Sequence, residues 1–118
     1  MTTEIVNTRS PRVVVTGDAT VTPLVADSGT TYVLTKADGD QTVNLPAGLG
    51  GEWFRFIRAH AGDGYSTIIN PDDGDTITTD DGTALAVGVS ITNDADHASV
   101  LDLPCIAAGS WAASGGFA

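Results

Sequence analysis

The chain has 118 residues, of which 42% are hydrophobic and 17% are charged, and its formal net charge at pH 7 is −10. This length suits one domain with one core, and the composition is not that of a disordered chain. The negative charge disfavours nucleic acid or a membrane surface as a direct partner, because affinity for phosphate comes largely from Lys and Arg. The single cysteine, Cys105, excludes an internal disulfide and a cysteine zinc cluster.

Targeting signals are not evident in the sequence. No apolar run reaches the roughly 18 residues that a membrane span needs. Residues 1–11 lack the apolar core of a secretion signal, so we expect synthesis in the cytoplasm. These first residues are polar and end in Ser10-Pro11, and we interpret them as an extended N-terminal arm before a single β domain at 12–118.

Short runs rich in Val, Ile, Thr and aromatic residues alternate with clusters of Gly, Asp and Pro. No segment keeps a 3.6-residue period, so the pattern predicts a nearly all-β chain. We expect a β-sandwich or jelly roll of about eight or nine short antiparallel strands. The expected strands, in chain order, lie at residues 12–16, 19–25, 31–35, 41–45, 52–59, 66–70, 76–79, 84–92 and 99–103.

Three of these segments carry further signals. Pro23 lies inside 19–25 and indicates an edge or bent strand. The Asp-Gly pair within 36–41 predicts a hairpin between the strands on either side. The clearest alternation is in 84–92, where four aliphatic residues at every second position predict a core face. These residues are Leu85, Val87, Val89 and Ile91.

The aromatic strand at 52–59 has apolar residues on both of its faces. One face carries Glu52, Phe54, Phe56 and Arg58, and the other carries Trp53, Arg55 and Ile57. Because Trp and Arg are enriched at binding hot spots, Trp53 and Arg55 are a candidate interface pair. A buried Trp53 with the Arg55 stem packed over it explains the same residues. Trp111 is expected to close the core.

The stretch from Asn70 to Thr83 contains five aspartates and two Asp-Asp-Gly triplets. Oxygen-rich loops of this kind are raw material for a calcium site, but no EF-hand frame fits the spacing here. We expect two turns around a short strand, with the aspartates forming a solvated acidic edge. A weak cation site without a motif remains open as an alternative.

Catalytic and cofactor motifs are weak throughout. His60 and His97 are the two histidines, and neither lies in a recognisable nucleophile frame. Cys105 follows Pro104 and looks like a small buried residue. The glycines of residues 48–51 lack the Lys-Ser/Thr ending of a phosphate loop. We therefore expect no enzyme, no bound cofactor and no metal, keeping a small hydrolase around His97, Asp94 and Asp96 as a remote alternative.

Three motifs together resemble those of a known family. They are Asp-Ser-Gly-x-Thr-aromatic-x-Leu at 27–34, Val-x-Leu-Pro at 43–46 and Gly-x-x-aromatic-x-Phe at 51–56. In these the chain resembles the small capsid decoration, or cement, proteins of tailed double-stranded DNA phages, over roughly residues 24–77. The resemblance implies a viral structural protein that assembles, commonly as a homotrimer, on the exterior of the mature head. There it bridges major capsid protein subunits.

The candidate residues for a capsid or subunit interface are Arg9, Arg12, Trp53, Arg55 and Arg58. All five basic residues lie in the first half of the chain, so we expect this half to face the shell and the acidic half to face solvent. The alternative function is a β-sandwich module of a phage fibre that binds a receptor or a carbohydrate. Exposed aromatic residues flanked by Asp and Asn would favour that alternative.

Overall fold

A computed structural model describes residues 12–59, 64–79, 81–93 and 99–115. Within these ranges the chain forms strands and one 3-10 turn, η1 (Val25–Asp27), so the all-β prediction is confirmed. No helix in the described part is long and apolar enough to cross a membrane. The strands are β1 (Val13–Thr16), β2 (Thr20–Val21), β3 (Thr31–Leu34), β4 (Gln41–Asn44), β5 (Trp53–Arg58), β6 (Thr67–Asn70), β7 (Thr76–Thr78), β8 (Ile91–Asn93), β9 (Ser99–Ala107), β10 (Ser110–Ala112) and β11 (Ser114–Gly115).

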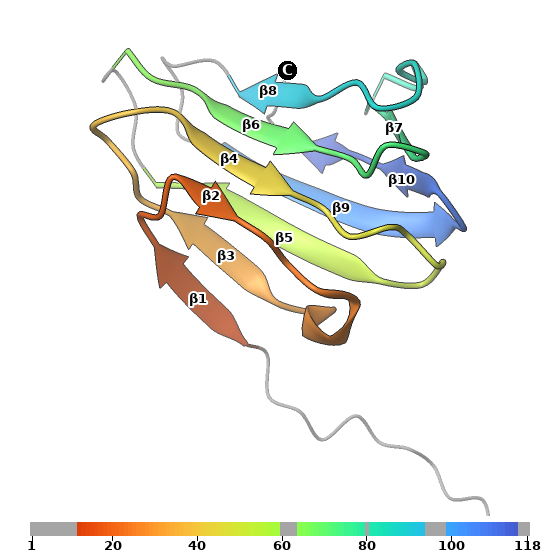
Figure 1. The fold of residues 1–118 in the computed structure, drawn as a ribbon, viewed down its shortest axis with the longest axis horizontal. Coiled ribbons are helices and arrows are strands. Elements are labelled where there is room, and N and C mark those ends of the chain that lie inside the picture. The colour runs from red at the N-terminus through yellow and green to blue at the C-terminus, as the bar shows by residue number, and fades with distance from the viewer. Residues whose placement is uncertain (1–11, 60–63, 80, 94–98, 116–118) are drawn as a thin grey trace, which may run out of the picture.

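The strands form two sheets that face each other (Figure 1). Sheet A, the larger, has the order β1-β3-β5-β9-β10-β7, with β11 also paired to β9. Sheet B has the order β2-β4-β6-β8. From β1 to β6 the chain therefore enters the two sheets in turn, so that each successive strand lies in the opposite layer. The two-layered architecture agrees with the expected sandwich.

The strand directions differ from the prediction. Within sheet A, β1, β3 and β5 are parallel neighbours, and within sheet B so are β2, β4 and β6. Antiparallel pairing appears where β9 joins β5 and where β8 joins β6. The expected antiparallel direction is thus wrong for the first six strands, which form coils stacked on one another within the two-layered sandwich. Parallel neighbours require a crossover between them, and here the crossover is a strand of the other sheet.

The hairpin predicted at 36–41 is wrong for the same reason. This segment leaves β3 in sheet A and enters β4 in sheet B. The turn is local, since the Lys36 ammonium contacts Asp38 at 2.9 Å and the Lys36 N–H donates to Gln41 Oε1 at 3.2 Å. An Asp-Gly pair marks a change of direction but does not determine which sheet the next strand joins. The Pro23 prediction is confirmed, because β2 ends two residues before it and lies at an edge of sheet B.

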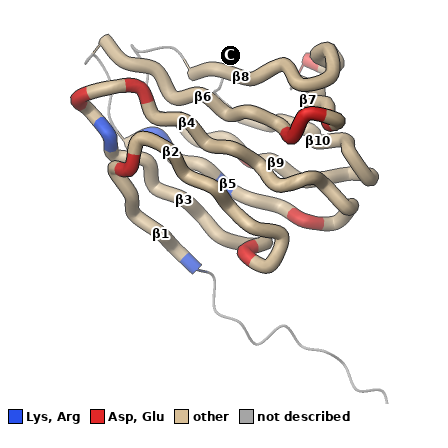
Figure 2. Tube along the Cα trace, in the orientation of Figure 1, with Lys and Arg blue, Asp and Glu red and all other residues tan. Residues whose placement is uncertain are grey.

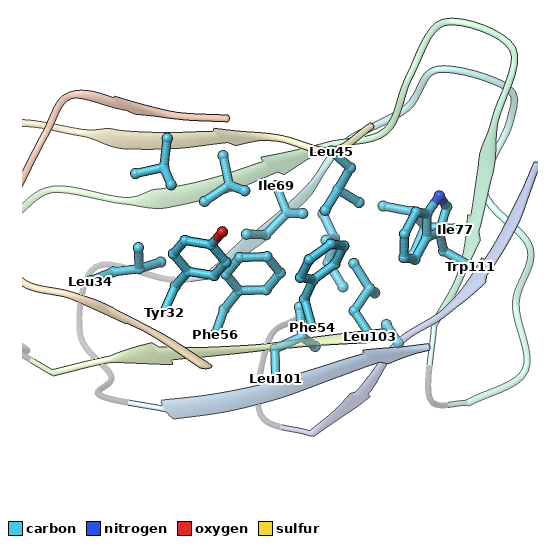
Figure 3. Packing of buried hydrophobic residues seen from close by; sticks show 14 of the residues in the cluster. Tyr32, Leu34, Leu45, Phe54, Phe56, Ile69, Ile77, Leu101, Leu103 and Trp111 are labelled. Atoms are coloured by element: carbon cyan, nitrogen blue, oxygen red, sulfur yellow. The ribbon is translucent and has the colours of Figure 1, made fainter. Parts of the chain in front are cut away.

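The core lies between the two sheets (Figure 3). Sheet A contributes aromatic and aliphatic side chains, and sheet B contributes aliphatic ones. Tyr32 and Phe56 stack with ring centroids 5.6 Å apart, and Phe54 stacks on Trp111 at 6.0 Å. Trp111 is fully buried, as predicted. The other buried apolar side chains are Val21, Leu34, Val43, Leu45, Ile69, Ile77, Ile91, Leu101, Leu103, Cys105 and Ala113.

One end of the interior is polar. Arg58, at the end of β5, is only 1% exposed, and its guanidinium donates to the Tyr65 carbonyl at 2.6 Å. Gln41 is buried as well and donates to the Thr16 carbonyl at 3.0 Å, and Asn93 donates to Ser99 Oγ at 2.6 Å. Because buried polar groups need partners, these bonds make the polar end compatible with folding.

The strand predicted at 84–92 is largely wrong. Of its four aliphatic residues, only Ile91 lies in a strand, at the start of β8, and only Ile91 is buried. Val87 and Val89 are exposed. The backbone turns at Gly88, whose φ of +76° suits glycine, and the Gly88 N–H donates to the Asp75 carbonyl at 2.9 Å. The alternation was therefore interrupted by a turn that the aliphatic pattern concealed.

The alternation along β5 makes a direct prediction for stability. Replacing the buried Phe56 with Ala should reduce the free energy of unfolding by about 3–5 kcal/mol, since a large side chain is lost from a packed interior. Trp53→Ala, on the opposite face of the same strand, is the matched control and should cost much less. Urea unfolding measures both variants. Equal losses for the two would contradict the assignment of their faces.

Candidate functional site

The outer face of sheet A is an apolar surface built in rows. Parallel register places Val15 beside Val33 and Val33 beside Ile57, and antiparallel register places Ile57 beside Val100. All four side chains point away from the core, since their strand neighbours are the inward residues. An unbroken aliphatic row therefore crosses four strands of the sheet. We call the outward residues of β1, β3, β5 and β9 the sheet A face.

Much of the sheet A face is accessible to solvent. Val13 is 61% exposed, Val15 67%, Val100 44% and Trp53 45%, and Ile106 at the end of β9 is exposed too. Val33 and Ile57, in the middle of the row, are half-buried. Because contiguous apolar surfaces of this kind are typical of interaction sites, the sheet A face is the candidate functional site.

Charge on the sheet A face is limited to one pair. Arg55 Nε donates to Asp102 Oδ1 at 2.6 Å, and Arg55 Nη2 lies 3.4 Å from Asp102 Oδ2. This hydrogen bond, and then the negative charge of Asp102, raise the pKa of Arg55. Trp53 lies on the same strand as Arg55, and the backbone N–H of Trp53 donates to Ser28 Oγ at 3.1 Å. The face is therefore apolar, locally neutral, and carries an exposed tryptophan.

The outer face of sheet B has the opposite character. Thr20, Thr42, Ile68 and Thr92 lie side by side across its four strands. One step along, Asn70 Nδ2 donates to Asn44 Oδ1 at 3.0 Å. This amide pairing across parallel strands satisfies the side chains without charge. The sheet B face is therefore mostly polar and suits contact with water.

Acidic residues lie mainly in the connections between strands (Figure 2). Within the described residues, Asp102 is the one acid that a strand carries on the sheet A face. Loop acids occur instead around β3 and β4, at Asp38 and Asp40, and before β7, at Asp72 and Asp73. Most of the negative charge of the described residues is thus carried by loops rather than by the strands of the apolar face.

Three of the five predicted interface residues belong to or border the sheet A face. Trp53 and Arg55 lie on it, and the alternative of a buried Trp53 is not what the structure has. Arg12 is exposed just before β1, where Nη1 contacts Asp27 Oδ1 at 3.1 Å. Arg58 points into the interior, so it is not a surface residue, and Arg9 lies outside the described residues.

Sequence reasoning missed the aliphatic part of this surface. Val13, Val15, Val100 and Ile106 were not singled out. The available signal was that the segments "VVVT" and "SVLDLPCIA" have apolar residues at both odd and even positions. A strand with two apolar faces buries only one of them in its own two-layered domain.

The Asp-rich stretch folds as predicted, with β7 between two turns. The Asp75 N–H bonds the Asp72 carbonyl at 2.9 Å, and the Gly82 N–H bonds the Thr79 carbonyl at 2.9 Å. The described residues contain no group of three or more His, Cys, Asp and Glu side chains that could hold a metal ion. The prediction of a wholly solvated acidic edge is wrong in one respect, since Asp75 is buried.

Asp75 has a structural role in this arrangement. Its Oδ2 accepts the Gly48 N–H at 2.8 Å and the Trp111 Nε1–H at 3.2 Å. Gly48 belongs to the loop between β4 and β5, and a Cβ there would lie 2.5 Å from Cys105 Sγ. The carboxylate therefore holds this glycine loop against the end of the core.

Most of the residues considered for catalysis lie outside the described part of the chain. Cys105 is buried, as predicted, and burial raises the pKa of its thiol, which lowers the fraction of nucleophilic thiolate. His60, His97, Asp94 and Asp96 all lie outside the described residues. The glycines at 48–51 connect two strands, as expected for a loop without a following helix.

No protein-family model matches the chain, and no curated protein matches it either.

The bonds of Asp75 lead to a second prediction. Asp75→Ala should lower the free energy of unfolding, because each of the two buried donors left without a partner costs about 1–3 kcal/mol. Asp73→Ala, an exposed neighbour in the same turn, should change it by no more than about 0.5 kcal/mol. Thermal and urea unfolding would measure the two variants in parallel. A similar small effect for both would rule out the structural role of Asp75.

Proposed function

We propose that this protein is a capsid decoration, or cement, protein that binds the outside of a mature phage head and stabilises it by bridging capsid subunits. The observation that supports this most is the sheet A face, an exposed apolar surface with Trp53 and Arg55 on it. A protein whose work is adhesion needs such a surface and needs no reacting groups. The resemblance at 27–34, 43–46 and 51–56 names the class of partner, the major capsid protein.

The distribution of charge supports docking through the sheet A face. The sheet A face is neutral, whereas the chain as a whole carries a charge of −10. Docking through this face removes apolar area from water, at about 25 cal/mol per Å², without burying an unpaired charge. The loop acids and the polar sheet B face stay in solvent, where they keep decorated particles from associating.

The stabilisation is mechanical and thermodynamic rather than chemical. A ligand that binds the assembled shell, and not its dissociated subunits, raises the stability of the shell by mass action. Binding across the joint between two capsid subunits adds buried area at the place where internal pressure separates them. Trp53 suits the centre of such a contact, because a partly exposed Trp offers a large area at small entropic cost.

The alternative, a glycan-binding or receptor-binding module of a fibre, has less support. An exposed aromatic residue is present in Trp53, but its neighbours are Gly29 and, across the sheet, Pro104. The nearest outward carboxylate across the sheet, Asp102, is bonded to Arg55 rather than left for a sugar hydroxyl.

Capsids that lack this protein provide the test. The purified protein should co-sediment with them saturably and raise their melting temperature. Trp53→Asp should weaken binding at least about tenfold, because it places a charge within an apolar contact. Thr42→Asp adds the same charge on the polar sheet B face and is the matched control, with binding expected to be unchanged. Binding of Trp53→Asp equal to wild type would rule out the sheet A face, and glycan binding without capsid binding would support the fibre module.

A further inference from the structure

The two sheets end differently at their margins. The outer side of β7 is covered by the chain itself, since Thr78 bridges to Ala84 and the Leu85 N–H bonds the Ile77 carbonyl at 2.9 Å. At the other margin of sheet A, β1 pairs with β3 on one side, and no described strand pairs with its other side (Figure 1). In sheet B, the edge strand β2 has only two residues.

Strand β1 contains no Lys, no Pro and no bulge, three features that often protect an edge. Natural proteins protect such strands with Lys, Pro, a bulge or very short length. Here the strand is Val13-Val14-Val15-Thr16, in regular register with β3 along its whole length. Val14 packs on the core, while Val13 and Val15 point outward and are strongly exposed. An unprotected edge with apolar side chains favours the addition of another strand.

The open side of β1 also offers its own hydrogen-bonding groups. The Arg12 and Thr16 carbonyls accept the Thr31 and Thr35 N–H groups at 2.8 Å and 3.0 Å, so this alternate set of backbone groups points to β3. Because backbone groups alternate along a strand, the N–H and C=O of Val13 and Val15 point to the open side. Unpaired groups of this kind are the template for strand addition.

We propose that β1 pairs antiparallel with β1 of a second copy of this chain, so that sheet A continues across a two-fold axis. In the register that places Val14 opposite Val14 of the partner, Val13 faces the partner's Val15, and both residues use their outward N–H and C=O groups. These residues lie on the sheet A face in both copies. The aliphatic row that ends at Val15 then becomes continuous from one copy to the other.

Charge complementarity favours a second copy as the occupant. Arg12 immediately precedes β1, and Asp18 follows it by two residues; both are exposed. Antiparallel pairing brings the Arg12 end of each strand toward the Asp18 end of the other, so that Arg12, which contacts Asp27 of its own chain at 3.1 Å, also approaches a carboxylate of the second copy. The two-fold axis creates this Arg-to-Asp approach twice. No charged residue lies within β1 itself, so no like charges meet at the centre.

The pairing extends the proposed function without resting on it. Two copies joined at β1 present one apolar face that is twice as wide, which suits a protein that bridges neighbouring subunits. A contact of this kind is isologous and closes with two copies, in contrast to the trimer that the resemblance implies.

The oligomeric state of the purified full chain, measured without capsids, tests the pairing separately from capsid binding. Sedimentation at about 100 µM, a concentration that saturates a micromolar contact, should give twice the 12.0 kDa chain mass. Val15→Pro removes an outward N–H and leaves the bonds to β3 in place, so it should give the single-chain mass. Val15→Lys should do the same, whereas Thr92→Lys on the sheet B face should leave the double mass unchanged.

Amide hydrogen exchange gives a readout that does not depend on the variants folding. The Val13 and Val15 amides of the wild-type chain should be protected at high concentration and lose protection on dilution. The Val14 and Thr16 amides, which face β3, should stay protected throughout. A single-chain or threefold mass for wild type, a double mass for Val15→Pro, or exchange at Val13 and Val15 that ignores concentration would each overturn the proposal.

Discussion

Register between parallel strands is the constraint on which the other features depend. Because β1, β3 and β5 run in one direction in sheet A, and β2, β4 and β6 in sheet B, residues at equivalent positions of successive coils lie side by side. Inward positions then form the core, where Tyr32 stacks on Phe56. The same register brings Asn44 against Asn70 on the outer face of sheet B. A slip of one residue would exchange inner and outer faces, so core packing and surface chemistry are fixed together.

Two outer faces of contrasting character follow from that register. The sheet B face is mostly polar, and the amides of Asn44 and Asn70 bond each other, so this face needs no partner besides water. The sheet A face is aliphatic, with one exposed Trp and a single ion pair, and it leaves apolar area in contact with water. In the proposed capsid decoration protein, the shell covers the sheet A face. The proposed pairing of β1 with a second copy widens the face that the shell would cover. Both proposals use the same physical fact, namely exposed apolar area without unpaired charge.

The sequence allowed good prediction of where most strands lie and poor prediction of how they connect. Alternation identified β5 and its two faces, and turn chemistry identified the turns around β7. Strand direction was not predicted correctly, because an Asp-Gly turn such as that at 36–41 has the same residue pattern in two cases. The chain can return beside its own strand or cross to another sheet. The exposure of Val13 and Val15 in β1 was not predicted, because a run of valines does not indicate which face of the strand is buried. Arg58 was wrongly assigned to the interface, because a charged side chain was assumed to lie at the surface. Its guanidinium is instead buried and donates a hydrogen bond to the backbone carbonyl of Tyr65.

The parallel stacking of coils can be checked at the pairing of β3 with β5. Nuclear Overhauser contacts between backbone protons of these strands in isotope-labelled protein would report their register. Parallel pairing predicts contacts of Thr31 with Arg55 and of Leu34 with Arg58, the residues that lie side by side in the structure. Contacts of Thr31 with Arg58 and of Leu34 with Arg55 would show antiparallel strands and contradict the account.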